Sequence, residues 1–117
     1  MSEDLYKVEQ QGDIVIVTLS LGDFLHDVNE QLMKGFDELF TQGHKKIVLD
    51  LADTNYMSSL ILASLVFIQK MAQEKGGNLV ICNIKARVQE ILTMTNLDKV
   101  FNITRTREEA MSFFAKQ

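Results

Sequence analysis

The pattern of apolar and polar positions changes period along the chain, and each change marks an expected element. Residues 5–9 alternate between apolar and polar side chains, whereas residues 14–19 are β-branched and apolar. Gln11-Gly12-Asp13 lies between the two runs and is typical of a turn. We therefore expect a β-hairpin at the start of the fold, with its first strand at an edge of the sheet.

Longer segments show the three- and four-residue spacing of apolar side chains that predicts amphipathic helices. Glycines mark two of the expected ends, because Gly43 suits a left-handed cap and Gly76-Gly77 closes a segment from Ser58-Ser59 to Lys75 that is too long for a strand. The expected helices lie between Gly22 and Gly43, from Ser58-Ser59 to Lys75, around residues 88–97 and at residues 108–115.

Short apolar runs between these helices, at residues 47–51, 79–82 and 100–103, predict strands. The first two are apolar on both faces, so helices must cover both sides of the sheet, or one side beside a tight edge. The order β-β-α-β-α-β-α-(β)-α predicts an α/β fold with a mixed, mostly parallel sheet of four to five strands and about four helices. With 117 residues, we expect a single domain over residues 1–117.

Composition narrows the class of protein. Hydrophobic residues make up 46% and charged residues 24% of the chain, an ordinary globular mix. The longest apolar run, residues 60–68, is far shorter than the ~20 residues that span a bilayer, so no membrane insertion is expected. The acidic start of the chain lacks the features of a signal peptide, and the single cysteine, Cys82, forms no internal disulfide. We expect a cytoplasmic protein.

Charge is unevenly spread along the chain. Residues 1–43 hold nine acids against two lysines, a net of −7, and residues 44–117 hold ten bases against seven acids, a net of +3. The total of −4 gives no electrostatic footprint for nucleic acid. The acidic first third suits a basic protein partner, although a solvated surface with uneven charge explains it equally well.

The residues that carry enzyme chemistry are scattered. His26, His44 and Cys82 fall on different expected elements and not at the spacing of zinc ligands, and no glycine-rich phosphate loop is present. Asp50 and Asp53 flank the end of a strand, but Asp53-Thr54-Asn55 more simply supplies the hydrogen bonds of a turn. We expect no enzyme activity, no cofactor and no metal.

The segment from Asp50 to Leu62 runs from a strand through a turn to a helix that begins at Ser58-Ser59. A serine at a helix start accepts a backbone hydrogen bond as an N-cap. The same helix end has unpaired N–H groups and a partial positive charge, so it tolerates a phosphate. A phosphoserine carries about −1.5 to −2 charges and would change this surface. The spacing alone leaves both interpretations open.

Three stretches resemble STAS domains of the bacterial anti-sigma factor antagonist type. The strand, aspartate, turn and serine of the family correspond to residues 47–63, its Gly-x-Leu/Ile-Asp to residues 22–25, and its tail to residues 91–103 followed by Glu108-Glu109-Ala110. The sequence departs from the family at Ser58 and Leu25, where the family has aspartates, and at Leu60-Ile61, where it has small residues.

The resemblance implies a partner-switching regulator of transcription. In this family an anti-sigma factor of the histidine-kinase-like ATPase class binds the unmodified antagonist and phosphorylates it on a serine, and a serine phosphatase resets it. By position the acceptor is Ser59, with Ser58 as the alternative. The expected partner-binding residues are Asp23, Leu25, Ser58, Ser59, Ile61 and Leu65.

The helix after the serines has more apolar positions than one buried face requires. Either its neighbours enclose it, or Ile61 and Leu65 are exposed in a docking patch. A second function remains open: a STAS scaffold subunit, never phosphorylated, in a larger complex such as a membrane-transport ATPase assembly. A receiver domain with Asp50 as acceptor is excluded, because no acidic pair follows the strand at residues 14–19 to hold its metal.

Overall fold

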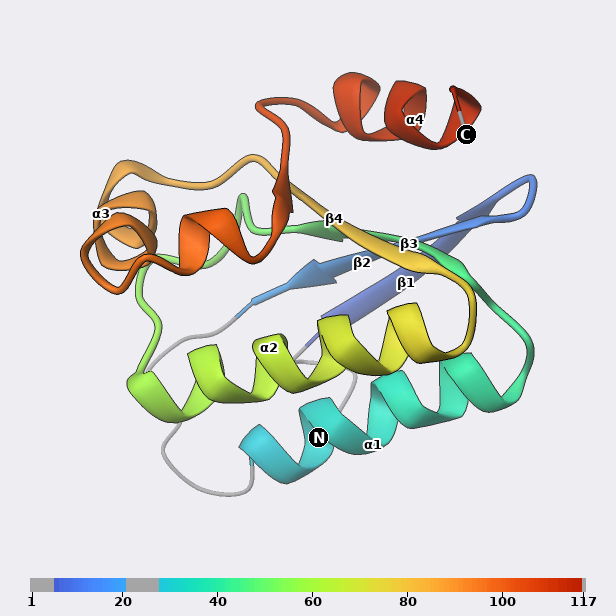
Figure 1. Ribbon diagram of the computed structural model, residues 1–117, viewed down its shortest axis with the longest axis horizontal. Coiled ribbons are helices and arrows are strands. Elements are labelled where there is room, and N and C mark those ends of the chain that lie inside the picture. The colour runs from blue at the N-terminus through green and yellow to red at the C-terminus, as the bar shows by residue number, and fades with distance from the viewer. Residues whose placement is uncertain (1–5, 21–27, 117) are drawn as a thin grey trace.

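The computed structural model describes residues 6–20 and 28–116 and contains one mixed sheet (Figure 1). Within these residues the strand order is β1-β2-β3-β4-β5, with β1 and β2 antiparallel and all later neighbours parallel. The strands are β1 (Tyr6–Gln11), β2 (Ile14–Leu19), β3 (Lys46–Asp50), β4 (Asn78–Cys82) and β5 (Asn102–Ile103). The expected mixed, mostly parallel sheet and its opening hairpin are confirmed.

Helices cover both faces of the sheet (Figure 1). α1 (Val28–Thr41) and α2 (Ser59–Glu74) lie side by side on one face, α4 (Arg107–Ala115) lies on the other, and α3 (Ala86–Met94) stands at the end of the sheet. None of the helices in the described residues is long and apolar enough to cross a membrane.

Successive side chains of each strand point to opposite faces of the sheet, so the core has two parts, one on each face. Ile47 and Leu49 of β3 pack in the larger part, with α1 and α2, whereas Val48 packs in the smaller part with Ala110 and Phe114 of α4. Because both faces of β3 are covered, its near-continuous apolar run is explained. The next residue on the α4 side, Asp50, is a carboxylate and is only 3% exposed.

Glycines fix two of the connections. Gly43 follows α1 with a φ of +94°, the left-handed conformation expected for a helix end. Gly77 lies so close to the Lys45 carbonyl that a Cβ atom there would collide with backbone, while Asn78 N–H donates to the same carbonyl at 2.8 Å. The α2–β4 connection therefore passes directly against the start of β3.

The last strand differs from its expected bounds. β5 contains only Asn102 and Ile103, because a 3₁₀ helix occupies Leu97–Lys99 and Val100 N–H continues its hydrogen bonding to Leu97 O at 2.9 Å. β1 stands at the edge of the sheet, and its side chains from Lys7 to Gln11 are exposed.

Candidate functional site

The two serines at the start of α2 have different surroundings. Ser58 is the N-cap, with extended backbone (φ −78°, ψ 164°), and its Oγ accepts a hydrogen bond from Ile61 N–H at 3.2 Å. Ser58 is half-buried, whereas Ser59, the first helical residue, is exposed. The capping task is thus met by Ser58, and the exposed serine beside it lies where the helix N-terminus is electrostatically positive.

The connection from β3 to these serines is held by specific contacts. Thr54, fully buried, donates its hydroxyl to Leu19 O at 3.0 Å, and its N–H donates to Leu51 O at 3.1 Å. Met57 inserts into the core and is 2% exposed. These contacts fix where α2 begins, so the serines are presented by an anchored segment.

The exposed face of α2 carries apolar side chains. Ser59, Leu60, Ala63 and Phe67 lie on this face, and we call these four residues the α2 stripe. Leu60 is 60% exposed and Phe67 55% exposed, so two large apolar side chains lie on the same exposed face. An exposed apolar face next to an exposed serine suits docking of a protein partner.

Of the two alternatives that the sequence left open for this helix, exposure of Ile61 and Leu65 in a docking patch is wrong. They are 7% and 1% exposed, because they lie one helical turn apart on the side of α2 that packs in the larger core. The long apolar run gave no clear periodicity, so the exposed residues Leu60 and Phe67 were missed. Lys70 could have indicated the exposed side of this helix. Residues three positions apart share a helix face, and a lysine at position 70 places Phe67 on a face that is exposed to solvent.

The neighbouring helix α1 presents an acidic surface. Glu30, Asp37 and Glu38 are exposed on α1, against one exposed base, Lys34. Part of the negative charge of the first 43 residues therefore lies on the helix next to α2 (Figure 1). Asp23 and Leu25, two of the expected partner-binding residues, lie outside the described residues.

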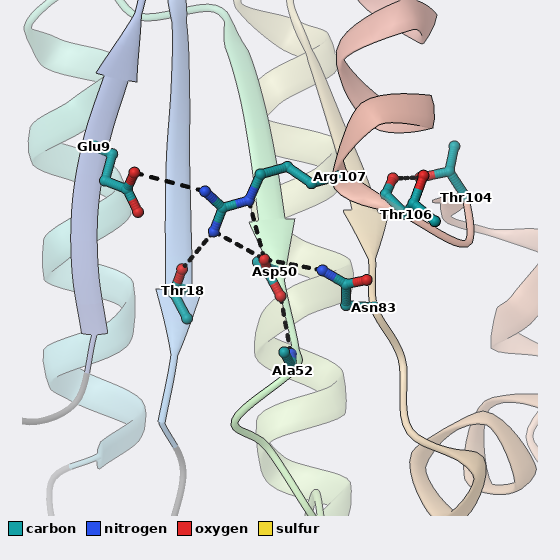
Figure 2. Close-up of polar contacts among 8 residues, drawn as sticks. All are labelled: Glu9, Thr18, Asp50, Ala52, Asn83, Thr104, Thr106 and Arg107. Atoms are coloured by element: carbon teal, nitrogen blue, oxygen red, sulfur yellow. Dashed lines mark hydrogen bonds and ion pairs between the residues drawn. The ribbon is translucent and has the colours of Figure 1, made fainter.

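A cluster of polar side chains surrounds the end of β3 on the α4 side (Figure 2). Oδ2 of Asp50 accepts hydrogen bonds from Arg107 Nε at 3.2 Å and Nη2 at 2.9 Å, and from Asn83 Nδ2 at 3.1 Å. Oδ1 of Asp50 accepts from Ala52 N–H at 2.9 Å. Arg107 Nη1 also lies 3.5 Å from Glu9 Oε1. We call Glu9, Thr18, Asp50, Asn83 and Arg107 the Asp50 cluster.

Two ionisable groups in or beside this cluster have pKa values raised by their surroundings. The hydrogen bond to Asp50 raises the pKa of the Arg107 guanidinium further above its ordinary value. Burial, and secondarily the charge of Asp50, raises the pKa of the Cys82 thiol to about 12. Cys82 is therefore a protonated, inert thiol at neutral pH. Among the described residues, no three His, Cys, Asp or Glu side chains are grouped to hold a metal ion.

The chain is similar to proteins of one family. The STAS domain family model matches residues 6–110. A Thermotoga neapolitana protein named "Putative anti-sigma factor antagonist TM1081 homolog" is 34% identical over 108 residues, which are 91% of this chain and 92% of that protein.

Two solved structures show how far the likeness extends. The crystal structure of the Thermotoga maritima protein TM1081, described as a "putative anti-sigma factor antagonist", has a TM-score of 0.84 at 28% identity and covers 95% of each chain. The Bacillus cell fate determinant SpoIIAA in its phosphorylated form has a TM-score of 0.70 at 17% identity, covering 93% of this chain and 98% of that one. The second likeness is one of fold.

Proposed function

The chain belongs to the STAS domain family, and from this premise we propose that it is an anti-sigma factor antagonist switched by phosphorylation of Ser59. Its proposed partner is an anti-sigma factor of the histidine-kinase-like ATPase class, and a serine phosphatase would reset it. We take residues 1–117 as one domain that regulates transcription in the cytoplasm by binding and without catalysis. The observation that carries the proposal is the division of tasks at α2, where Ser58 caps the helix and Ser59 is exposed.

In the unmodified state, the α2 stripe supplies an apolar docking surface next to the acidic face of α1. Burying Leu60 and Phe67 against a partner releases water from two large exposed side chains, and such burial favours association. The acidic residues Glu30, Asp37 and Glu38 favour a partner with a basic rim, because complementary charge speeds encounter.

Phosphorylation changes this surface at one atom. A phosphoryl group on Ser59 Oγ adds about −1.5 to −2 charges at the margin of the α2 stripe. The helix N-terminus partly stabilises that charge within the free antagonist, whereas a docked partner would have to desolvate it. A penalty of about 3 kcal/mol weakens binding more than a hundredfold.

Ser58 is the poorer acceptor in this arrangement. Its oxygen accepts the Ile61 N–H hydrogen bond, and the residue is half-buried, so a kinase must break the cap to reach it. SpoIIAA, which has the same fold, exists in a phosphorylated form, which supports the view that this architecture accommodates a phosphoryl group.

Intact mass spectrometry after incubation with the cognate anti-sigma kinase and ATP tests the proposal. We expect one added phosphoryl group on the wild type and on Ser58→Ala, and none on Ser59→Ala. A Ser59→Asp variant is expected to bind the kinase at least about a hundredfold more weakly than the wild type. If an active kinase leaves the wild type unmodified, or if Ser59→Asp binds as tightly, the switch is refuted.

A second function is favoured by one observation. Leu60, 60% exposed, stands directly after Ser59, where it adds bulk to the path of a kinase. The large Leu60 side chain is compatible with a STAS scaffold that is never phosphorylated. Such a scaffold would dock through the α2 stripe in a larger complex, such as a membrane-transport ATPase assembly. Both functions predict loss of partner binding in Leu60→Asp, so phosphorylation separates them: the scaffold predicts none under any condition, whereas the switch predicts one phosphoryl group on Ser59.

A further inference from the structure

We propose that Arg107 and Asp50 form a positioning pair that holds the connection leading to Ser59 in the geometry required for modification. The local part of this inference stands on the contacts of the free protein, and the part about modification rests on the proposed function. The pair joins the C-terminal helix α4 to the segment between β3 and α2, although the two residues are 57 positions apart in the sequence.

Asp50 is the last residue of β3, and both of its carboxylate oxygens are used. Oδ1 accepts from Ala52 N–H and so closes the first turn of the connection, while Oδ2 accepts from Arg107 and Asn83. The side chain is only 4% exposed. Burying a carboxylate to this degree is costly unless charged or polar donors replace its water.

Arg107 supplies the compensating charge from another element. It is the first residue of α4, and its guanidinium lies across the ends of β3 and β2 toward β1 (Figure 2). In addition to its two bonds to Asp50, Nη2 lies 3.4 Å from Thr18 Oγ1 and Nη1 lies 3.5 Å from Glu9 Oε1. Contacts to three strands leave the guanidinium little freedom to move away.

The carboxylate acts on the connection by two routes. The direct route is the Ala52 hydrogen bond. The second passes through Asn83, which has a left-handed φ of 57° and begins the segment that carries Lys85, and Lys85 Nζ donates to Asn55 Oδ1 at 2.7 Å. Both routes end on residues 52–55, only a few residues before the Ser58 cap.

Replacing Arg107 is therefore expected to loosen the segment between β3 and α2 as well as α4. Without the guanidinium, Asp50 is a buried carboxylate without its cation, and its side chain must rotate toward water. This rotation weakens the bond that Oδ1 accepts from Ala52. A purely structural tether of α4 predicts instead that only α4 loosens.

Hydrogen exchange on the free protein separates these two outcomes. In Arg107→Gln we expect the amides of Ala52 and Thr54 to exchange about tenfold faster or more than in the wild type. Arg105→Gln is the matched control, because Arg105 lies just before α4, forms an exposed ion pair with Glu109 of that helix and, within the described residues, forms no hydrogen bond or ion pair with Asp50. Faster exchange confined to α4 in Arg107→Gln overturns the proposal.

Further variants separate the effect of the Asp50–Arg107 pair from a general loosening of α4. Phe114→Leu loosens the apolar packing of α4 without touching the pair, so we expect faster exchange in α4 and an unchanged Ala52 amide. Asp50→Asn and the double variant Asp50→Asn/Arg107→Gln are expected to affect Thr54 N–H equally, because the two groups act as one unit. Additive effects of the two substitutions contradict a paired action.

Phosphorylation kinetics with the cognate kinase test the functional part. We expect Arg107→Gln to lower kcat about fivefold or more with a smaller change in KM, and Arg107→Lys to recover part of the loss, since a point charge still reaches Asp50. A modified wild type with unchanged kcat in Arg107→Gln refutes the positioning role alone. An unmodified wild type refutes the proposed switch instead, and the exchange result on the pair then stands by itself.

Discussion

Two neighbouring serines at the start of α2 have the same side chain and different physical tasks. Ser58 has extended backbone and lends its oxygen to Ile61 N–H, so it replaces a hydrogen bond that the helix cannot make for itself. Ser59 has helical backbone and faces solvent. A difference of one position separates a residue that stabilises the fold from one whose side chain is exposed to solvent.

The capping role makes a prediction about stability. Ser58→Ala is expected to lower the free energy of unfolding by about 1 kcal/mol, because Ile61 N–H loses its acceptor. Ser58→Asp is expected to retain the wild-type value, since aspartate caps equally well and its charge suits the helix N-terminus. Urea unfolding followed by circular dichroism measures both. Ser59→Ala is the control, and a loss as large as that of Ser58→Ala would contradict the assignment of the cap.

Another residue of α2 opposes stability. Gln69 is 1% exposed, and neither its Oε1 nor its Nε2 has a hydrogen-bond partner among the described residues. Gln69→Met keeps the length of the side chain and removes the buried amide. We expect it to raise the free energy of unfolding by about 1–2 kcal/mol. Gln73→Met, at an exposed position of the same helix, is expected to change little, and an equal gain there would point to helix propensity instead.

At the scale of elements, the order of strands and helices follows from the sequence, because short continuous apolar runs indicate strands and apolar side chains at three- and four-residue spacing indicate helices. The runs at residues 14–19 and 47–51 are apolar and short, and they form β2 and β3 as expected. α2 was harder, because its apolar residues fill much of the circumference and the side that faces the core is set by contacts with the sheet and α1. The sequence therefore predicted the helix but left open whether Ile61 and Leu65 are exposed, and the structure buries both.

The connection between α2 and β4 gives a prediction at this scale. Gly77→Ala would place a Cβ against the Lys45 carbonyl, so backbone has to shift. We expect a loss of about 1–3 kcal/mol in the free energy of unfolding, as for other overpacked sites. Gln73→Ala, in the exposed last turn of α2, is the near-neutral reference. A Gly77→Ala protein as stable as the wild type would show that the connection moves aside freely.

At the scale of the whole molecule, the sheet separates two unequal halves. One face carries α1 and α2 and the larger part of the core, and the other carries α4 (Figure 1). The Asp50 cluster lies on the α4 side (Figure 2). The pairing of Asp50 with Arg107 was not predicted from the sequence, because nothing local connects residues so far apart. Two signals were present: an aspartate that ends an apolar strand, and an arginine in the first turn of a helix, where acids are favoured.

The buried Cys82 thiol, in the smaller part of the core, makes the free energy of unfolding fall at alkaline pH. Burial raises the pKa of Cys82 to about 12, from about 9 for an exposed thiol. The unfolded chain therefore loses the thiol proton at a lower pH than the folded protein. The contribution of the protonated thiol to folding stability is complete below about pH 9 and is lost as the pH rises toward 12. We expect Cys82→Ala to lose less stability than the wild type between pH 8 and pH 10, measured by urea unfolding. Parallel declines in the two proteins would contradict the burial of the thiol.

β1 lies at the outer edge of the sheet, and Lys7 and Glu9 project from its exposed surface. Charged side chains on an outer strand discourage a second chain from extending the sheet, because ladder pairing would bring those charges close together out of water. Neighbouring copies of this chain would then remain separate molecules and resist growth into fibrils through this strand.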